Sequence, residues 1–333
     1  MESKTRIKGN VHYVGVNDRN KHRFEAMWPL PYGVSYNSYL IDDEMVALVD
    51  TVDICYFEVY LRKIKQVIGE RPINYLIINH MEPDHSGSIR LIKQHYPEII
   101  IVGNKQTFGM IEGFYGVTGE QYLVKEGDFL ALGHHKLRFY MTPMVHWPET
   151  MMTFDETDGV LFSGDGFGCF GTVDGGFLDT RINVDKYWGE MVRYYSNIVG
   201  KYGSPVQKAL QKLGGLPISA ICSTHGPVWT ENIAKVIGIY DRLSRYDADE
   251  GVVIAYGSMY GNTEQMAEAI AEELSAQGVK NIVMHNVTKS HPSYIIADIF
   301  RYKGLIIGSP TYSNQIFPEV EALLSKILLR EVK

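Results

Sequence analysis

The sequence predicts an α/β protein in which helices cover two sheets, followed by a second and smaller strand–helix unit. Three observations predict this fold class. Short apolar runs of strand length alternate with segments of helical periodicity. Four of the predicted strands end at a histidine or an aspartate, which indicates a site along one rim of the sheets. A polar segment then precedes one further buried strand.

Composition excludes several classes of protein. The chain has 333 residues, which is enough for about two domains. A net charge of -7 argues against binding to nucleic acid. The three cysteines include no CxxC pair, so we expect no disulfide framework and a reducing compartment. The polar N-terminus and the absence of a long apolar run predict a cytoplasmic protein that does not interact with membranes.

The elements of the first part follow from its apolar patterns. Residues 11–50 predict short strands joined by turns, the last of them buried at 46–49. Apolar residues at helical spacing predict a helix over 55–69. The further predicted strands are 73–79, 99–102, 137–142, 151–154, 160–163 and 218–224, and the further helices are 88–95, 184–198 and 204–213.

The run from His80 to His85 contains four potential metal ligands, His80, Glu82, Asp84 and His85. It follows a buried strand. A continued strand would alternate these side chains between its two faces, whereas a loop can curl around an ion. Imidazoles together with carboxylates suit iron, manganese or zinc. The alternative is a polar loop that only caps the strand.

Three later strands end in the same way, at His146, Asp165 and His225. Glycines beside Asp165 and His225 would allow the backbone to approach an ion closely. His134 and His135 stand in a turn signal, so we interpret them as solvated turn residues. The remaining histidines do not follow a strand end: His12, His22, His95, His285 and His291.

This order of ligands resembles the metallo-β-lactamase-like fold, an αββα sandwich. Hydrolases of that fold carry histidine where this chain has Glu82. The glutamate is similar to that of the flavodiiron proteins, also called A-type flavoproteins. The resemblance implies that Asp165 bridges two irons and that no catalytic residue is needed beyond the ligands. It assigns His80, Glu82 and His146 to one iron, and Asp84, His85 and His225 to the other.

The chemistry of this ligand set independently favours iron over zinc. Three carboxylates favour hard, higher-valent ions and therefore ease oxidation of ferrous iron, whereas zinc has no redox chemistry. Asp50 either orients the ligand loop or forms a structural turn. Trp147 either lines a gas pocket or packs in the core. Tyr194 and Tyr195 lie on a predicted helix and are not counted as site residues.

The polar segment 242–251 is the predicted linker, which divides the chain into domains 1–245 and 251–333. After a buried strand at 252–256 comes a hydroxyl-rich loop and then a helix with apolar residues at 266, 267, 270, 271 and 274. A loop of this kind at a helix N-terminus is a phosphate cradle, although it is not a Walker loop. It resembles the FMN phosphate loop of flavodoxins, with Ser258, Met259, Tyr260, Gly261, Asn262 and Thr263.

Two more strands, 281–285 and 304–308, support this resemblance. The loop after them is similar to the one beside the isoalloxazine ring, and consists of Pro310, Thr311, Tyr312, Ser313 and Asn314. The alternative is an ordinary strand–loop–helix unit. A flavodoxin sheet has five strands in the order 2-1-3-4-5. Only three strands and a helix at 318–329 are predicted here. We therefore expect a partial doubly wound sheet, a fragment or shortened product with an exposed third strand.

The resemblance implies an oxidoreductase that reduces O2 to water, NO to N2O, or both, at a di-iron centre. FMN would take electrons from a donor protein, such as rubredoxin or a reductase, and pass them to the iron pair. The family also implies a head-to-tail homodimer or a homotetramer. One alternative is a zinc or manganese hydrolase of the same fold. Another is a redox carrier or sensor without gas turnover.

Overall fold

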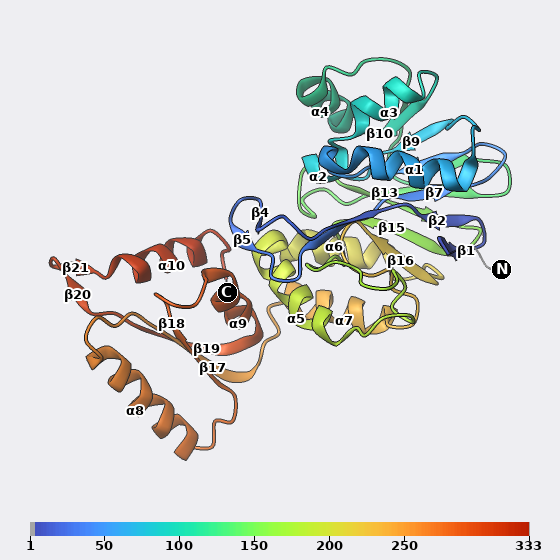
Figure 1. Ribbon diagram of the computed structural model, residues 1–333. Coiled ribbons are helices and arrows are strands. Elements are labelled where there is room, and N and C mark those ends of the chain that lie inside the picture. The colour runs from blue at the N-terminus through green and yellow to red at the C-terminus, as the bar shows by residue number, and fades with distance from the viewer. Residues whose placement is uncertain (1–3, 333) are drawn as a thin grey trace.

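The first part of the chain is a sandwich of two sheets with helices on both outer faces (Figure 1). The computed structural model describes residues 4–332. One sheet has seven strands: β1 (Arg6–Lys8), β2 (Val11–Tyr13), β7 (Tyr39–Ile41), β8 (Ala47–Val49), β9 (Tyr75–Ile77), β10 (Ile100–Gly103) and β11 (Gln121–Leu123). The other has five: β12 (Phe129–Ala131), β13 (Lys136–Met141), β14 (Met151–Asp155), β15 (Val160–Gly164) and β16 (Ala220–Ser223).

Three apolar layers hold the sandwich together. The middle layer lies between the sheets and includes Val49, Phe139 and Phe162. The outer layers lie under the helices: α1 (Phe57–Ile68), α3 (Ile89–His95) and α4 (Lys105–Tyr115) on one side, α5 (Asp185–Tyr194), α6 (Gly203–Leu213) and α7 (Ile233–Ser244) on the other. The αββα prediction is therefore confirmed.

Strand direction brings one end of each sheet to the same rim. Strands β8, β9 and β10 run parallel, as do β15 and β16. β13 pairs antiparallel with β14, so the loop between them returns at the end of β13. The carboxyl ends of β9, β13, β15 and β16 therefore supply the loops that carry the predicted ligands.

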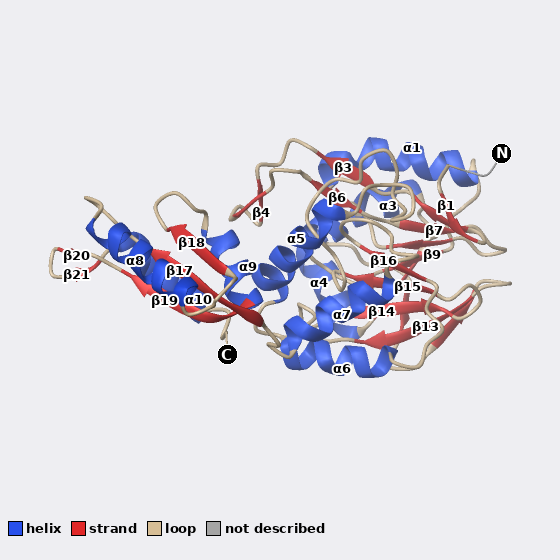
Figure 2. Ribbon diagram, turned by 90° about the horizontal axis from the view of Figure 1, so that it is seen from below, coloured by secondary structure: helices blue, strands red, loops and turns tan. Residues whose placement is uncertain are grey.

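The last part of the chain forms a separate three-stranded parallel sheet in the order β18-β17-β19 (Figure 2). Its strands are β17 (Asp249–Tyr256), β18 (Ile282–Asn286) and β19 (Tyr302–Gly308), and its helices are α8 (Asn262–Ala276), α9 (Pro292–Arg301) and α10 (Pro318–Leu328). Alternate side chains of β17 face opposite sides: Val253 packs with α9 and α10, whereas Ile254 packs with α8. This is the predicted strand order 2-1-3.

The sequence analysis missed or misplaced several elements. Helix α4 was not predicted, because Gly109 and Gly113 weaken its helical pattern; Asn104 caps its start by accepting from two backbone N–H groups. Helix α9 was also not predicted. The helix predicted at 184–198 divides into α5 and a π-helical turn, Tyr195–Val199. Of the predicted apolar face of α8, only Ala267 is buried, and Met266 is 65% exposed.

The predicted linker is shorter than 242–251, because α7 continues to Ser244 and β17 begins at Asp249. The division into domains 1–245 and 251–333 stays a prediction. The remaining short elements are β3 (Val16–Asp18), β4 (Arg23–Phe24), β5 (Trp28–Pro29), β6 (Val34–Tyr36), η1 (Ile54–Tyr56), α2 (Pro83–Ser86), β20 (Thr311–Tyr312) and β21 (Gln315–Ile316). Within residues 4–332, no helix has both the length and the apolar composition needed to cross a bilayer.

Candidate metal centre

Each predicted ligand lies just beyond the carboxyl end of a strand. His80 follows β9, and His146 lies in the loop after β13. Asp165 follows β15 directly, and His225 follows β16. Gly164 precedes Asp165 with a φ of +54°, a left-handed conformation that turns the chain sharply at the strand end.

The first ligand run is not wholly a loop as predicted. Asp84 and His85 lie in α2, a single helical turn that starts with Pro83 at its first position. Proline is common at this position because its fixed φ suits a helix. The N–H that it lacks would have no partner within the helix there. Glu82 precedes the turn in an extended conformation, so its side chain leaves the backbone in a different direction from that of Asp84.

The seven side chains converge into two groups. Within each group the ligand atoms lie within 4.8 Å of one another, and every residue is buried. The first group is His80, Glu82, His146 and Asp165, and the second is Asp84, His85 and His225. These groups have the memberships that the resemblance implied.

Asp165 contacts both groups, one through each carboxylate oxygen. Its Oδ2 lies 3.1 Å from His146 Nε2 and 3.6 Å from His80 Nε2. Its Oδ1 lies 3.0 Å from His85 Nε2 and 3.7 Å from His225 Nε2. This is the position that a bridging carboxylate between two ions would take.

Many inward atoms of the cluster are buried without a hydrogen-bond partner among the described residues. Leaving so many buried polar atoms unpaired costs free energy, so such atoms point to a missing ligand. A pair of metal ions would satisfy them, and nitrogen and carboxylate oxygen are suitable donors for it. The unpaired atoms include His80 Nε2, Glu82 Oε2, both Asp84 oxygens, His85 Nε2 and His225 Nε2.

Contacts behind the ligands orient them. Asp50 accepts hydrogen bonds from the backbone N–H of Asn79 at 2.7 Å and from its side-chain amide at 3.0 Å, next to His80. This favours the first of the two alternatives for Asp50, a role in orienting the ligand loop. The φ of +53° shows that Asp50 also forms a tight turn.

Sequence reasoning missed three further contacts. Glu149 Oε1 lies 2.9 Å from His80 Nδ1. The backbone carbonyl of Ser35 lies 2.7 Å from His225 Nδ1, and the Thr224 hydroxyl donates to Asp165 Oδ1 at 2.5 Å. Only Glu149 had a signal in the sequence, as a glutamate in the ligand-bearing loop between two apolar strands.

Without an ion, the carboxylates hold protons on the imidazoles. Burial opposes the charge on His85, but Asp84 and Asp165 outweigh it and raise its pKa to about 9. Burial likewise opposes the charge on His146, but Asp165 and Glu82 raise its pKa to about 9. Burial opposes the charge on Asp165, but His85, His80 and His146 outweigh it and hold its pKa well below the usual range. The centre thus favours positive charge, which metal ions would supply in place of the protons.

Other predicted residues have mixed outcomes. Trp147 lies edge-on to His80, with ring centroids 5.3 Å apart, so it adjoins the ligands. The Tyr194 ring lies 5.6 Å from that of His225, and its buried hydroxyl has no partner among the described residues. Tyr195 packs instead against Tyr240.

One inference is wrong, and one glycine has a further explanation. His135 is not a solvated turn residue: it is 1% exposed, and its Nδ1 lies 2.9 Å from Asp155 Oδ2. The turn places it against the end of β14, where that carboxylate compensates its burial. Gly226 has a φ of +78°, and a Cβ there would meet Cys169 Sγ at 2.3 Å, so packing against Cys169 also requires a glycine here. Its predicted role in close approach to an ion stays a prediction.

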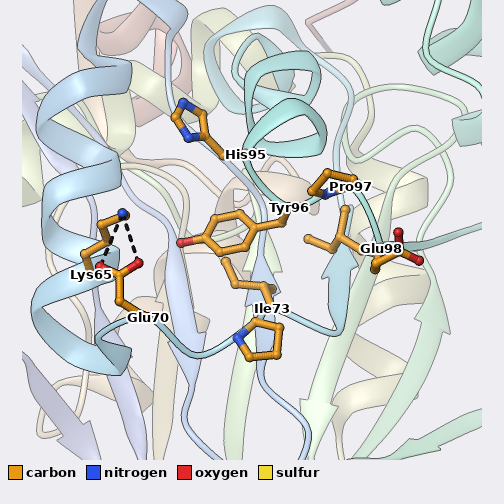
Figure 3. A pocket seen from close by; sticks show the side chains of 9 residues that line it. Lys65, Glu70, Ile73, His95, Tyr96, Pro97 and Glu98 are labelled. Carbon is orange, nitrogen blue, oxygen red and sulfur yellow. Dashed lines mark hydrogen bonds and ion pairs between the residues drawn. The ribbon is translucent and has the colours of Figure 1, made fainter.

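His95 lines a surface pocket that includes none of the predicted ligands (Figure 3). The pocket is also lined by Tyr96, Lys65 and Glu70. The ammonium group of Lys65 lies 3.4 Å from the carboxylate of Glu70. His95 belongs to none of the groups of potential metal ligands found among the described residues.

The two predicted flavin loops have suitable conformations. Gly261 has a φ of +90° immediately before α8, and Tyr260 is 90% exposed. The N–H groups at the start of this long helix favour an anion. The second loop is a tight hairpin, β20–β21, whose turn residues Ser313 and Asn314 both have positive φ. These loops project at the end of the molecule away from α2 (Figure 1).

Comparisons with known proteins agree with this architecture. Residues 34–226 match the ODP family beta lactamase, and residues 254–332 match flavodoxin. The anaerobic nitric oxide reductase flavorubredoxin of Vibrio vulnificus is 32% identical over 96% of this chain and 66% of its own length. That of Escherichia coli is 31% identical over 96% of this chain and 68% of its own. The chain thus spans about two thirds of the length of these curated relatives.

Two solved structures share the fold closely. The rubredoxin oxygen:oxidoreductase of Desulfovibrio gigas has a TM-score of 0.93 and 30% identity, over 97% of this chain and 82% of that one. The flavodiiron protein of Giardia intestinalis has a TM-score of 0.93 and 28% identity, over 97% and 79%. Fold and site define a metal protein with a metallo-β-lactamase-like sandwich and a flavodoxin-like unit. The chain belongs to the flavodiiron protein family.

Proposed function

We propose that this protein is an oxidoreductase that reduces O2, NO or both at a pair of iron ions, with electrons delivered through FMN. The observation that carries the proposal is the convergence of seven buried ligands into two groups that share Asp165. His80, Glu82 and His146 would hold one ion, and Asp84, His85 and His225 the other. Iron, when bound, supplies electrons by cycling between the ferrous and ferric states.

The chain's own residues give the centre its charge and seclusion. The four imidazoles are neutral, and the three carboxylates carry three negative charges. These charges nearly balance the four positive charges of two divalent ions. Phe24 lies edge-on to His225 at 5.2 Å, and Phe170 lies 5.0 Å from Tyr194, so aromatic rings shield one side of the centre from water. A secluded centre suits small uncharged substrates such as O2 and NO.

Glu82 argues against the alternative of a zinc or manganese hydrolase. Its Oε2 lies 3.3 Å from His146 Nε2 and 3.5 Å from His80 Nε2, so it faces the same point as these ligands. A third carboxylate around the pair favours harder and higher-valent ions than zinc. No contact in the described residues favours hydrolysis specifically.

The flavin loops support FMN binding, and their position supports a homo-oligomer. The start of α8 would hold the FMN phosphate, and the β20–β21 hairpin would lie beside the ring. Because these loops lie away from the metal centre in one protomer, a second copy would have to bring its flavin to the iron pair (Figure 1). The relatives' names indicate rubredoxin-type proteins as electron donors.

The test is consumption of both gases by the whole chain. Protein loaded with ferrous iron and FMN under anaerobic conditions is mixed with a chemical reductant, and O2 and NO are followed separately with electrodes. We expect consumption of at least one gas, which depends on iron. Protein that consumes neither gas, or that is purified anaerobically with two zinc ions and no iron, would contradict the proposal.

A further inference from the structure

The contact behind His80, in the first group of ligands, differs from those behind the two histidines of the second group. His80 Nδ1, in the first group, lies 2.9 Å from the carboxylate of Glu149. His225 Nδ1, in the second group, lies 2.7 Å from the neutral backbone carbonyl of Ser35. His85 Nδ1, also in the second group, is buried without a partner among the described residues.

Glu149 is held firmly in place. Its side chain is fully buried, and Oε1 also accepts the backbone N–H of Met81 at 2.9 Å. Its backbone carbonyl accepts a hydrogen bond from the Asn104 side chain at 2.6 Å. The other oxygen, Oε2, is buried and has no partner among the described residues. A buried carboxylate needs compensating positive charge, and the contact through His80 leads to the metal centre.

A carboxylate behind a metal-binding histidine changes the ligand in two ways. It accepts the Nδ1 proton and so fixes the tautomer in which the Nε2 lone pair faces the ion. It also makes the imidazole more basic, which strengthens binding. A neutral carbonyl fixes the tautomer with a smaller gain in basicity, and an unpaired Nδ1 does neither.

We propose that Glu149 is a positioning residue that makes the two ions unequal. The ion held by the first group is bound more tightly than the ion held by Asp84, His85 and His225. Loss of such an outer contact typically weakens metal binding by about 10- to 100-fold. This inference rests on the two-ion centre of the proposed function, and it concerns the order in which the two positions fill.

The test is an anaerobic titration of the metal-depleted full chain with Co²⁺, followed by visible absorption. We expect two phases whose dissociation constants differ by about tenfold or more. The Asp84→Asn variant removes the charge of a ligand from the second group only, so it should weaken the weak phase further and leave the tight one unchanged. The Glu149→Gln variant keeps the side-chain size but loses the charge. It should weaken the tight phase about 10- to 100-fold and leave the weak phase unchanged.

A matched control is available elsewhere in the fold. Asp155 makes the same kind of buried contact, 2.9 Å from His135 Nδ1. Asp155 also belongs to a separate group of potential ligands with His135 and Asp158, so Asp155→Asn would change only Co²⁺ bound there and should leave both phases unchanged. Equal affinities in the wild type, or an equal loss in both phases of Glu149→Gln, would overturn the inference alone. A wild type that binds fewer than two ions would contradict the proposed function as well. The wild-type titration stays decisive if Glu149→Gln fails to fold.

Discussion

The bridging position of Asp165 makes the sharpest prediction, which the substitution Asp165→Asn tests. The amide has the size of the carboxylate and can still accept the hydrogen bond from Thr224, so only the charge is lost. The carboxylate oxygens lie 3.0 to 3.7 Å from four imidazole nitrogens, two from each group. The lost charge therefore affects both ions.

The magnitude follows from Coulomb's law. Two unit charges 4 Å apart attract by about 4 kcal/mol at an effective dielectric constant of about 20. Each 1.4 kcal/mol is about a factor of ten in affinity. Because each ion carries two positive charges, the figure for unit charges is a lower bound, and both ions should bind at least about a thousandfold more weakly. After equilibrium dialysis at micromolar ferrous iron, elemental analysis should find the wild type filled and Asp165→Asn nearly empty.

The control is Asp174→Asn, which removes an exposed carboxylate that pairs with Arg19 and Lys186. Exposed ion pairs contribute little to stability, and this one is not among the ligands, so metal content should not change. An Asp165→Asn protein that binds two ions with affinities within tenfold of the wild type would refute the bridging assignment.

Three further predictions concern stability and flavin binding. Asp50→Ala removes two buried hydrogen bonds to Asn79 and should lower the free energy of urea unfolding by about 2–4 kcal/mol; a change below half of this would show that the turn is held otherwise. Burial lowers the pKa of His135, but Asp155 outweighs burial and raises the pKa above 6.5. The contact between the protonated His135 and Asp155 therefore stabilises the folded state at low pH, and this contribution is lost as pH rises through the raised pKa. Unfolding at pH 5.5 and 8.5 should therefore show a smaller pH dependence in His135→Gln than in the wild type, and equal dependences would count against the pair. Gly261→Ala leaves its surroundings free but strains a φ of +90°, so FMN binding, measured by fluorescence quenching, should weaken by about 1–2 kcal/mol, whereas Gly238→Ala should have no effect.

The ligands could be predicted because their signal is local. His80, His146, Asp165 and His225 each follow an apolar run of strand length, and parallel strands end at one edge of a sheet. The helical turn at Asp84 and His85 was less predictable, because four residues are too few for a periodicity to appear. Helix α4 was not predicted, because its two glycines lower the helix propensity of the segment. Tertiary packing overrides this low propensity, so the helix forms.

The pairing of each outer contact with its ligand depended on tertiary structure. Glu149 and His80 are 69 residues apart, and Ser35 and His225 are 190 apart, so nothing in the local pattern joins them. The same holds for His135, which a turn signal placed in solvent but which the fold buries against Asp155. Strand ends and ligand types are properties of short segments, and the sequence alone determines them. Which carboxylate lies behind which histidine depends on how the two sheets pack, and so do the relative affinities that we infer for the two ions.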